Sequence, residues 1–233
     1  MKLNLLKKSF LGLLVSCAAV CSYADNDATG GVSLGATRVI YPVGAKQVSL
    51  SIFNSGKKNR YLINSWVENK AEEKTKDFLV TPPLFVSEPN SENTLRIVNL
   101  GTQLPQDRES VYWLNVKSIP SIDKELLADK NTLQIAVLSR IKLFVRPEGL
   151  TMKPETALEK ITFTKDANGV EVDNQSPYHI SFVEVYVDDT KVENMMAPPL
   201  SKTKISKISG KKISYQTVND FGGLTPKIDK ILN

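Results

Sequence analysis

Short segments that alternate apolar and polar residues, as β-strands do, make up almost the whole chain. They are rich in Val, Ile, Leu and aromatic residues, and turn sequences with Pro, Gly or Asn separate them. No segment keeps a helical period beyond about two turns. The pattern restricts the chain to all-β folds and predicts an antiparallel sandwich of about seven strands, of the immunoglobulin-like class. The first six expected strands are 32–41, 47–53, 61–68, 94–100, 111–119 and 132–145.

A second series of strands begins after Pro147-Glu148-Gly149. A chain of 233 residues is long for one domain and suits two of about 100 residues each. We therefore expect an all-β protein with two immunoglobulin-like β-sandwich domains, an N-terminal one over 25–150 and a smaller one over 151–233. The strands expected in the second domain are 160–164, 170–172, 179–187, 203–208 and 211–217.

The first 24 residues have the composition of a secretory signal peptide. Three lysines within the first eight residues precede an apolar run over 10–20 and a small-x-small site at 22–24. This site predicts cleavage between Ala24 and Asp25. The run is too short and too early in the chain for a stable membrane span. The formal charge of +5 falls to about +2 without the leader lysines, so nothing in the composition requires nucleic acid or an anionic membrane.

Both cysteines, Cys17 and Cys21, lie inside this leader. The mature chain would then contain no cysteine and form no disulfide, even in an oxidising compartment. The alternative is a bacterial lipoprotein signal at 14–17, which would lipidate Cys17 and anchor the protein. The better site at 22–24 favours cleavage.

The segment 131–147 combines an apolar row with a basic row. Leu133, Ile135 and Val137 share one face at the period of two of a strand. Its second half carries cations at even positions, which are Arg140, Lys142 and Arg146. The segment fits either a long core strand with a solvated charged end or an edge strand that pairs with another protein.

Signals for catalysis are weak. Gly31 to Gly35 matches the G-x-S-x-G nucleophile elbow, with His179 downstream, but Ser33 precedes a strand where that motif would open a helix. His179 is the single histidine, so no histidine-based metal cluster can form, and we expect it at a strand start with backbone hydrogen bonds. We therefore expect no catalytic residue, no metal, no cofactor and no small-molecule substrate. The lysines at 202, 204, 207, 211 and 212 indicate a solvated sheet face.

Several separate motifs carry a resemblance to a known family. They are GVSLGATRVIYP at 31–42, TPPLF at 81–85, QLPQDRESVYWLNVKSIP at 103–120, RIKLFVRP at 140–147 and NDFGG at 219–223. With these motifs the chain resembles the periplasmic pilus-assembly chaperones of the PapD-like family. It is most similar to the short-loop branch that includes the type 1 pilus chaperone. The absence of a mature cysteine pair fits this branch.

The resemblance implies two immunoglobulin-like domains set at an angle, with a pilus or fimbrial subunit docked between them. In this mode, donor-strand complementation, Leu133, Ile135 and Val137 fill the open hydrophobic groove of a subunit that lacks its last strand. By match to the family pattern, Arg38 and Lys142 hold the C-terminal carboxylate of the subunit and fix the register of the strand.

Two further sets of residues follow from the resemblance. Glu109, Arg146 and Asp220 match residues that link the domains by charge pairing, whereas the alternative is three unrelated surface charges. The outer-membrane usher would dock on Leu62, Thr81, Pro82 and Pro83, although Leu62 could equally be core and the Pro pair only a turn.

The sequence as a whole predicts a non-enzymatic periplasmic chaperone that captures pilus subunits and hands them to an usher. The alternative is an extracellular or lipid-anchored immunoglobulin-like structural protein. A mature protein that is free in the periplasm and co-purifies with pilin-like polypeptides would favour the chaperone.

Overall fold

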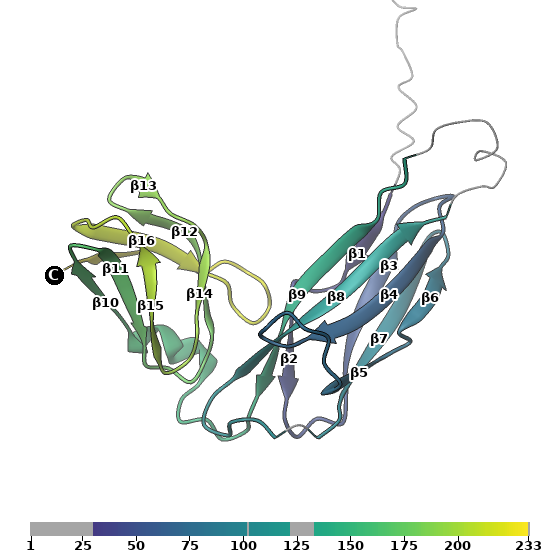
Figure 1. Cartoon of the computed structure of the whole chain (residues 1–233), viewed down its shortest axis with the longest axis horizontal. Helices are drawn as coiled ribbons and strands as arrows, with labels where there is room; N and C mark the ends of the chain where they lie inside the picture. The colour runs from purple at the N-terminus through teal and green to yellow at the C-terminus, as the bar shows by residue number, and fades with distance from the viewer. Residues whose placement is uncertain (1–29, 102, 122–132, 233) are drawn as a thin grey trace, which may run out of the picture.

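The computed structural model describes residues 30–101, 103–121 and 133–232, which form two β-sandwich domains (Figure 1). The predicted leader with Cys17, Cys21 and Ala24 lies outside these residues, as does Thr132. Across the three described ranges, no helix is long and apolar enough to cross a bilayer. The helical segment η2 (Pro154–Lys160) is a 3₁₀ helix that follows the connection between the domains.

The first domain packs two sheets against each other. One sheet has the order β1 (Val32–Leu34), β3 (Val48–Asn54), β7 (Ser91–Asn99), β5 (Phe78–Thr81). The other has the order β2 (Arg38–Pro42), β9 (Val137–Arg146), β8 (Ser110–Pro120), β4 (Tyr61–Glu68), β6 (Leu84–Ser87).

Alternation along these strands places one row of side chains between the sheets. Leu50 and Ile52 of β3 are buried there, and Ser51 between them is not. The rings of Tyr41, Phe78 and Tyr112 meet edge to face, with centroids 5.7 and 4.9 Å apart. This aromatic cluster belongs to the first core and joins the two sheets.

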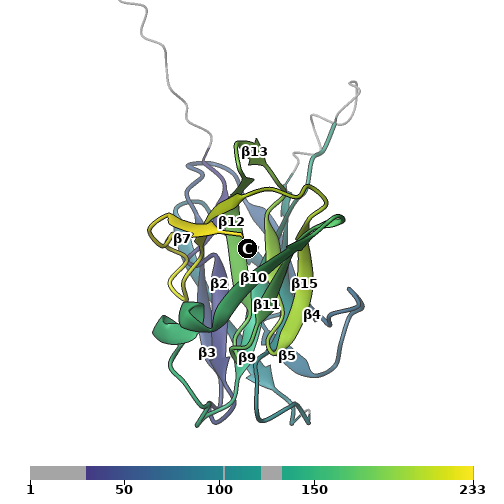
Figure 2. The ribbon, with the colours of Figure 1, turned by 90° about the vertical axis from the view of Figure 1, so that its left-hand side faces the viewer.

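The second domain has its own core and two sheets, seen from its outer side in Figure 2. Phe163, Phe182 and Tyr215 pack with centroids 5.1 to 6.1 Å apart. One sheet has the order β10 (Ile161–Asp166), β11 (Gly169–Asn174), β15 (Ser201–Ser206). The other has the order β13 (Thr190–Lys191), β12 (Ile180–Val187), β16 (Lys212–Thr217), β17 (Ile228–Ile231), and β14 (Met195–Ala197) also pairs with β12.

The segment 32–41, which the sequence predicts as one strand, changes sheet in its middle. β1 pairs antiparallel with β3, whereas β2 pairs in parallel with β9, so the expectation of a wholly antiparallel fold is also wrong. Gly35 makes the crossing, since its N–H donates to the Ser51 carbonyl at 2.8 Å and a Cβ would lie 3.2 Å from the Ser51 side chain. Close backbone approach of this kind favours glycine.

Other differences concern short strands and strand ends. β5, β6, β13, β14 and β17 have two to four residues, which is too short for alternation to reveal them. β9 begins at Val137, so residues 133–136 of the strand predicted over 132–145 have no regular structure in the free chain.

A buried asparagine organises one end of each sandwich. The Asn54 side-chain amide donates to the carbonyls of Asn59, Ser87 and Glu88 at 2.8 to 3.3 Å. In the second domain, the Asn174 amide donates in the same way to three carbonyls at 2.8 to 3.2 Å, those of Tyr178, Ala197 and Pro198. Each side chain thereby satisfies carbonyl groups of the loops and strand ends around it.

Replacing Asn174 by Leu, which has a similar volume, should lower the free energy of unfolding of the second domain by about 3 kcal/mol, because it leaves buried carbonyls unpaired. Urea unfolding followed by circular dichroism measures this loss. Asn168→Leu, on the exposed turn after β10, is the matched control and should change stability by less than about 0.5 kcal/mol. Equal losses in the two variants would contradict the role given to Asn174.

Candidate functional site

One edge of β9 is only half paired. β8 accompanies β9 from Val137 to Val145, but β2 accompanies it on the other side only from Lys142 to Arg146. Within the part of the chain that the structure describes, no strand lies beside residues 137–141 on that edge. Unpaired backbone N–H and C=O groups in an extended edge are a template for another strand.

The apolar row predicted from the sequence is exposed next to this edge. Leu133, Ile135 and Val137 are 84, 66 and 56% exposed. They fall on the same odd-numbered positions as Leu143 and Val145, which are buried in the first core. Val137 thus lies on the core face of β9, and Leu133 and Ile135 would extend this face if residues 133–136 became part of the strand. Nothing among the described residues covers the row.

Arg38 and Lys142 stand opposite each other in the register of β2 and β9. Lys142 Nζ donates to Ser181 Oγ at 2.9 Å, and Arg38 Nη1 donates to the Val218 carbonyl at 3.0 Å. Both partners are neutral groups of the second domain. Arg38 Nε is buried and has no hydrogen-bond partner among the described residues. The two cations therefore lie side by side where the free edge of β9 ends.

The pKa of each of these side chains is lowered, and burial is the main cause. Burial, together with the charge of Arg38, lowers the pKa of Lys142 to about 8. Burial also lowers the pKa of Arg38, although the charges of Asp220 and Glu109 oppose the shift. An anion placed between the two side chains would stabilise the charged form of both.

The space beside these cations is a cavity of about 470 Å³ between the domains. Arg38, Lys142 and Trp113 line it from the first domain. The second-domain wall is largely apolar and includes Val183, Met195 and Met196. The pocket therefore offers positive charge at one wall and hydrocarbon at the other.

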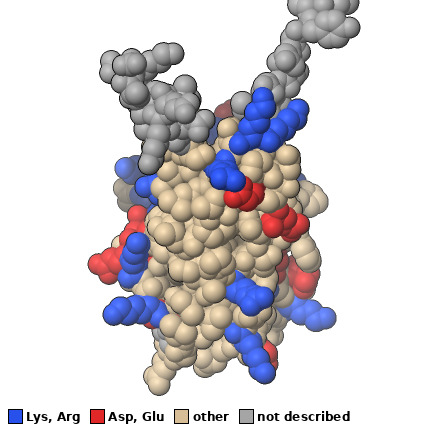
Figure 3. All heavy atoms as spheres, turned by 90° about the vertical axis from the view of Figure 1, so that its right-hand side faces the viewer, with Lys and Arg blue, Asp and Glu red and all other residues tan. Residues whose placement is uncertain are grey.

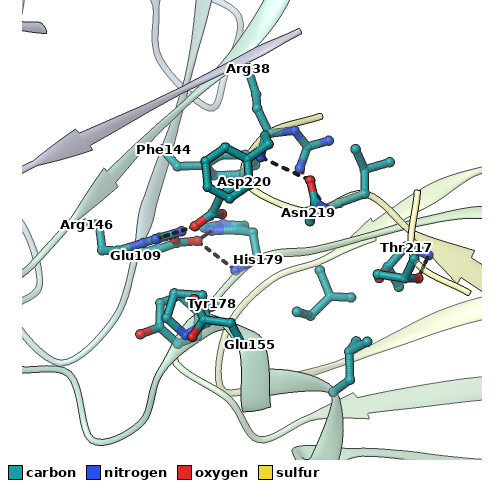
Figure 4. Close-up of a pocket in the computed structure, with 16 residues that line it drawn as sticks. Arg38, Glu109, Phe144, Arg146, Glu155, Tyr178, His179, Thr217, Asn219 and Asp220 are labelled. Atoms are coloured by element: carbon teal, nitrogen blue, oxygen red, sulfur yellow. Dashed lines mark hydrogen bonds and ion pairs between the residues drawn. The ribbon is translucent and has the colours of Figure 1, made fainter. Parts of the chain in front are cut away.

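Buried charges join the two domains at the other end of β9 (Figure 4). Arg146 donates to Glu109 Oε1 at 2.7 Å and to both oxygens of Asp220 at 2.6 and 2.8 Å. The Glu109 and Asp220 side chains are 2 and 34% exposed. Burial alone would lower the pKa of Arg146, but the hydrogen bonds to Asp220 and the charge and hydrogen bond of Glu109 raise it. The three predicted residues are thus in direct contact.

His179 belongs to the same cluster, which the sequence did not indicate. Its backbone N–H donates to Glu109 Oε2 at 2.9 Å, and its ring Nδ1 lies 3.4 Å from the same oxygen. The predicted hydrogen bonds from His179 to the backbone are therefore replaced by a carboxylate contact. The ring also packs on Phe144, with centroids 5.5 Å apart.

The remaining predicted residues lie on the first domain away from this junction. Leu62 is partly exposed on β4, opposite the exposed Val86 of β6, so it is not core. The Thr81-Pro82-Pro83 turn joins β5 to β6 on the same edge, where the Pro83 carbonyl accepts from the Ser65 N–H at 2.8 Å. The side of the domain that bears β6 has few charged side chains across its middle (Figure 3).

The described residues give no support to the nucleophile elbow or to a metal site. Ser33 stands within β1, and the next element along the described chain is the strand β2 instead of the helix that a nucleophile elbow opens. Within the described ranges, no group of three or more His, Cys, Asp or Glu side chains could hold a metal ion. Arg140, the third cation of β9, stacks on Trp113 at 4.4 Å and pairs with Glu68 and Glu72 at 3.5 and 3.1 Å.

Sequence reasoning missed the second-domain partners of the cations. Ser181 and the Val218 carbonyl receive hydrogen bonds from Lys142 and Arg38 across 39 and 180 positions of the chain. A serine inside an apolar strand and a backbone carbonyl give no pattern that would have revealed them.

Two family models match this chain. "Pili and flagellar-assembly chaperone, PapD N-terminal domain" matches residues 31–151, and "Pili assembly chaperone PapD, C-terminal domain" matches residues 156–228. The chain therefore belongs to the PapD-like family of pilus-assembly chaperones.

Similar proteins carry related names. The chain is 46% identical over 234 residues to the probable fimbrial chaperone SfmC of Escherichia coli K12, covering 100% of this chain and 99% of that protein. It is 47% identical over 208 residues to the chaperone protein FimC of the same strain, covering 88 and 86%. Among solved structures, the periplasmic chaperone SfaE has a TM-score of 0.77 and 43% identity, covering 87 and 100%. The SafA pilin in complex with the SafB chaperone, from Salmonella enterica, has a TM-score of 0.78 and 29% identity, covering 87 and 97%.

Removing Glu109 should destabilise the junction more than removing Asp220. Glu109→Ala takes away a fully buried partner of Arg146, which should cost about 3–5 kcal/mol. Asp220→Ala removes a partly solvated partner and should cost about 1 kcal/mol. Thermal melting measures stability, and solution X-ray scattering should show a wider spread of interdomain angles in both variants. Unchanged scattering and melting in both would contradict a linking role for the cluster.

Lys142 should make the stability of the free protein depend on pH. The folded state loses the Lys142 proton near pH 8 and the unfolded state keeps it to about pH 10.5, so stability should rise with pH between these values. Lys142→Met should raise stability by about 1–2 kcal/mol at pH 7, since solvent screens part of the shift. This gain should shrink towards pH 10.5. Urea unfolding at pH 7 to 10.5 measures it, with Lys204→Met as the exposed control; a gain that does not vary with pH would contradict the prediction.

Proposed function

We propose that the mature chain is a periplasmic chaperone that captures pilus or fimbrial subunits by donating β9 and delivers them to the outer-membrane usher. The observation that carries this proposal is the free edge of β9, flanked by an exposed apolar row and ended by two cations in register. Membership of the pilus-assembly chaperone family supports it. Capture by strand pairing makes and breaks no covalent bond, so the function needs neither a catalytic residue nor a cofactor.

Strand addition explains the free edge. A subunit that lacks its last strand has an exposed groove, and the row Leu133, Ile135 and Val137 would fill it, each side chain contributing about 1.5–3 kcal/mol. Backbone pairing along residues 133–141 would order the irregular residues 133–136. Because main-chain hydrogen bonds depend little on sequence, one chaperone can serve several subunits.

The two cations define where the added strand ends. A strand on the free edge lies in line with β2, which begins at Arg38 opposite Lys142. A strand that runs parallel to β9 therefore brings its C-terminal carboxylate to these two side chains. The resulting charge-assisted hydrogen bonds would contribute about 1.5–3 kcal/mol each and fix the register of the strand. A slip by one residue would turn the apolar row away from the groove.

The charge cluster and the first-domain edge serve other steps of the same function. Glu109, Arg146 and Asp220 hold the second domain against β9 and keep the cavity beside Lys142 open. Leu62 with the turn formed by Thr81, Pro82 and Pro83 is the proposed contact for the usher. The signal peptide ending at Ala24 would deliver the chain to the periplasm.

The carboxylate anchor is tested by variants of Arg38 and Lys142. Lys142→Ala and Arg38→Ala should each abolish capture of the subunit that co-purifies with the unmodified chain, without unfolding the chaperone. Lys204→Ala, which removes an exposed lysine of the second domain, should capture normally. Periplasmic pull-down with mass spectrometry measures capture.

A peptide with the C-terminal sequence of that subunit separates an anchor from a general charge effect. Amidation of the peptide should weaken binding to the unmodified chain by about tenfold or more, and should make little difference to either variant. Normal capture by both variants would overturn the assignment of Arg38 and Lys142.

Ile135 tests the role of the apolar row. Ile135→Asp places a charge where the groove expects hydrocarbon, so subunit capture should fail. The circular dichroism and melting of the free chain should change little, because Ile135 is already exposed. A variant that fails to fold would show instead that Ile135 belongs to the core of the chaperone.

A further inference from the structure

The loop between β16 and β17 presents two large apolar side chains to solvent. Phe221 is 97% exposed and Leu224 is 58% exposed. The loop, in yellow in Figure 1, reaches from the second domain towards the first. Single exposed apolar residues are common on protein surfaces, so the conformation of the loop decides whether this pair has a role.

Hydrogen bonds within the loop fix its shape. Asn219 Oδ1 accepts from the backbone N–H groups of Phe221 and Gly223 at 3.0 and 2.9 Å, and the Asn219 N–H donates to the Gly223 carbonyl at 2.9 Å. Gly222 has a φ of +83°, which an L side chain rarely adopts. Phe221 is therefore held outwards by a defined turn.

Contacts with the first domain fix the position of the loop. Asp220 is paired with Arg146 through both carboxylate oxygens, and Val218 accepts from Arg38. A Cβ on Gly222 would lie 2.3 Å from Thr37 Oγ1, so the loop packs directly on the residue before Arg38. The loop that carries Phe221 is thus part of the second domain and is held in place by contacts with the first.

We propose that Phe221 and Leu224 form a preformed apolar contact for the body of the pilus subunit whose C-terminus reaches Arg38. This inference rests on the proposed function. One nitrogen of the Arg38 guanidinium holds Val218 of the loop, so a carboxylate bound to the same guanidinium brings the subunit next to the loop. The contact is therefore continuous with the carboxylate anchor.

The chemistry of the loop suits a protein surface with exposed hydrocarbon. Between Val218 and Pro226 the single charged residue is Asp220, and Arg146 neutralises it. Aromatic side chains contribute strongly at interfaces, and a side chain that is already positioned loses less entropy on binding. Differences of this kind appear mainly in the dissociation rate of a complex.

The test compares three variants in complex with the subunit that co-purifies with the unmodified chain. Phe221→Ala should raise the dissociation rate of the purified complex about tenfold. Asn219→Ala, which keeps the aromatic ring and releases the turn, should raise it by a smaller factor. Ile231→Ala removes an apolar side chain that is 81% exposed at the opposite end of the β16–β17 hairpin and should leave the rate unchanged.

Subunit exchange kinetics measure the dissociation rate of each complex, and melting of each free chaperone shows whether the variant is folded. A Phe221→Ala complex that dissociates at the unmodified rate overturns this inference and leaves the proposed function intact. Equal acceleration by Ile231→Ala also overturns it, because the effect would then not depend on the loop. Failure of the unmodified chain to capture any subunit overturns both proposals.

Discussion

The incomplete pairing of β9 is the constraint on which the proposed function depends. The first strand of the sandwich changes sheet at Gly35, so its second half, β2, reaches β9 only at Lys142. Upstream of that point, the described residues leave the backbone of β9 and its apolar row uncovered. If both halves of the first strand paired with β9, this part of the edge would be covered.

The same strand also holds the second domain. Near its C-terminal end, the odd-numbered Ile141, Leu143 and Val145 of β9 pack in the first core. The even-numbered Lys142, Phe144 and Arg146 contact the second domain. Lys142 contacts Ser181, Phe144 packs on His179 and Arg146 binds Asp220. These contacts fix the second-domain wall of the cavity relative to β9, the strand that is proposed to bind the subunit. Because the Arg146 cluster is largely buried, separating the two domains there would cost much free energy.

Local sequence patterns predicted much of this arrangement, but they failed where contacts between distant parts of the chain determine strand pairing and strand ends. Alternation of apolar residues indicated the all-β class, most of the longer strands and the apolar row of β9. It predicted a single strand for 32–41, because the alternation of apolar and polar residues does not show that the two halves pair with different sheets. It also placed the start of the last strand of the first domain at 132, whereas β9 begins at Val137. Leu133 and Ile135, which precede β9, are exposed. The turn residues of 219–223 were recognisable as a motif, but not the contacts they make across the junction.

The sequence by itself determined the strand-forming segments, the absence of cysteine after residue 21, the apolar and basic rows of β9 and, through its motifs, the family. These are properties of residue type and spacing, which a strand converts directly into two faces. Only the tertiary structure decided that Arg38 lies opposite Lys142, that His179 contacts Glu109 and that Phe221 is held outwards. The first two contacts join residues far apart in the chain, and the turn that carries Phe221 is positioned by long-range contacts of Asp220 with Arg146 and of Val218 with Arg38. Such contacts depend on how two sheets and two domains pack rather than on any local preference.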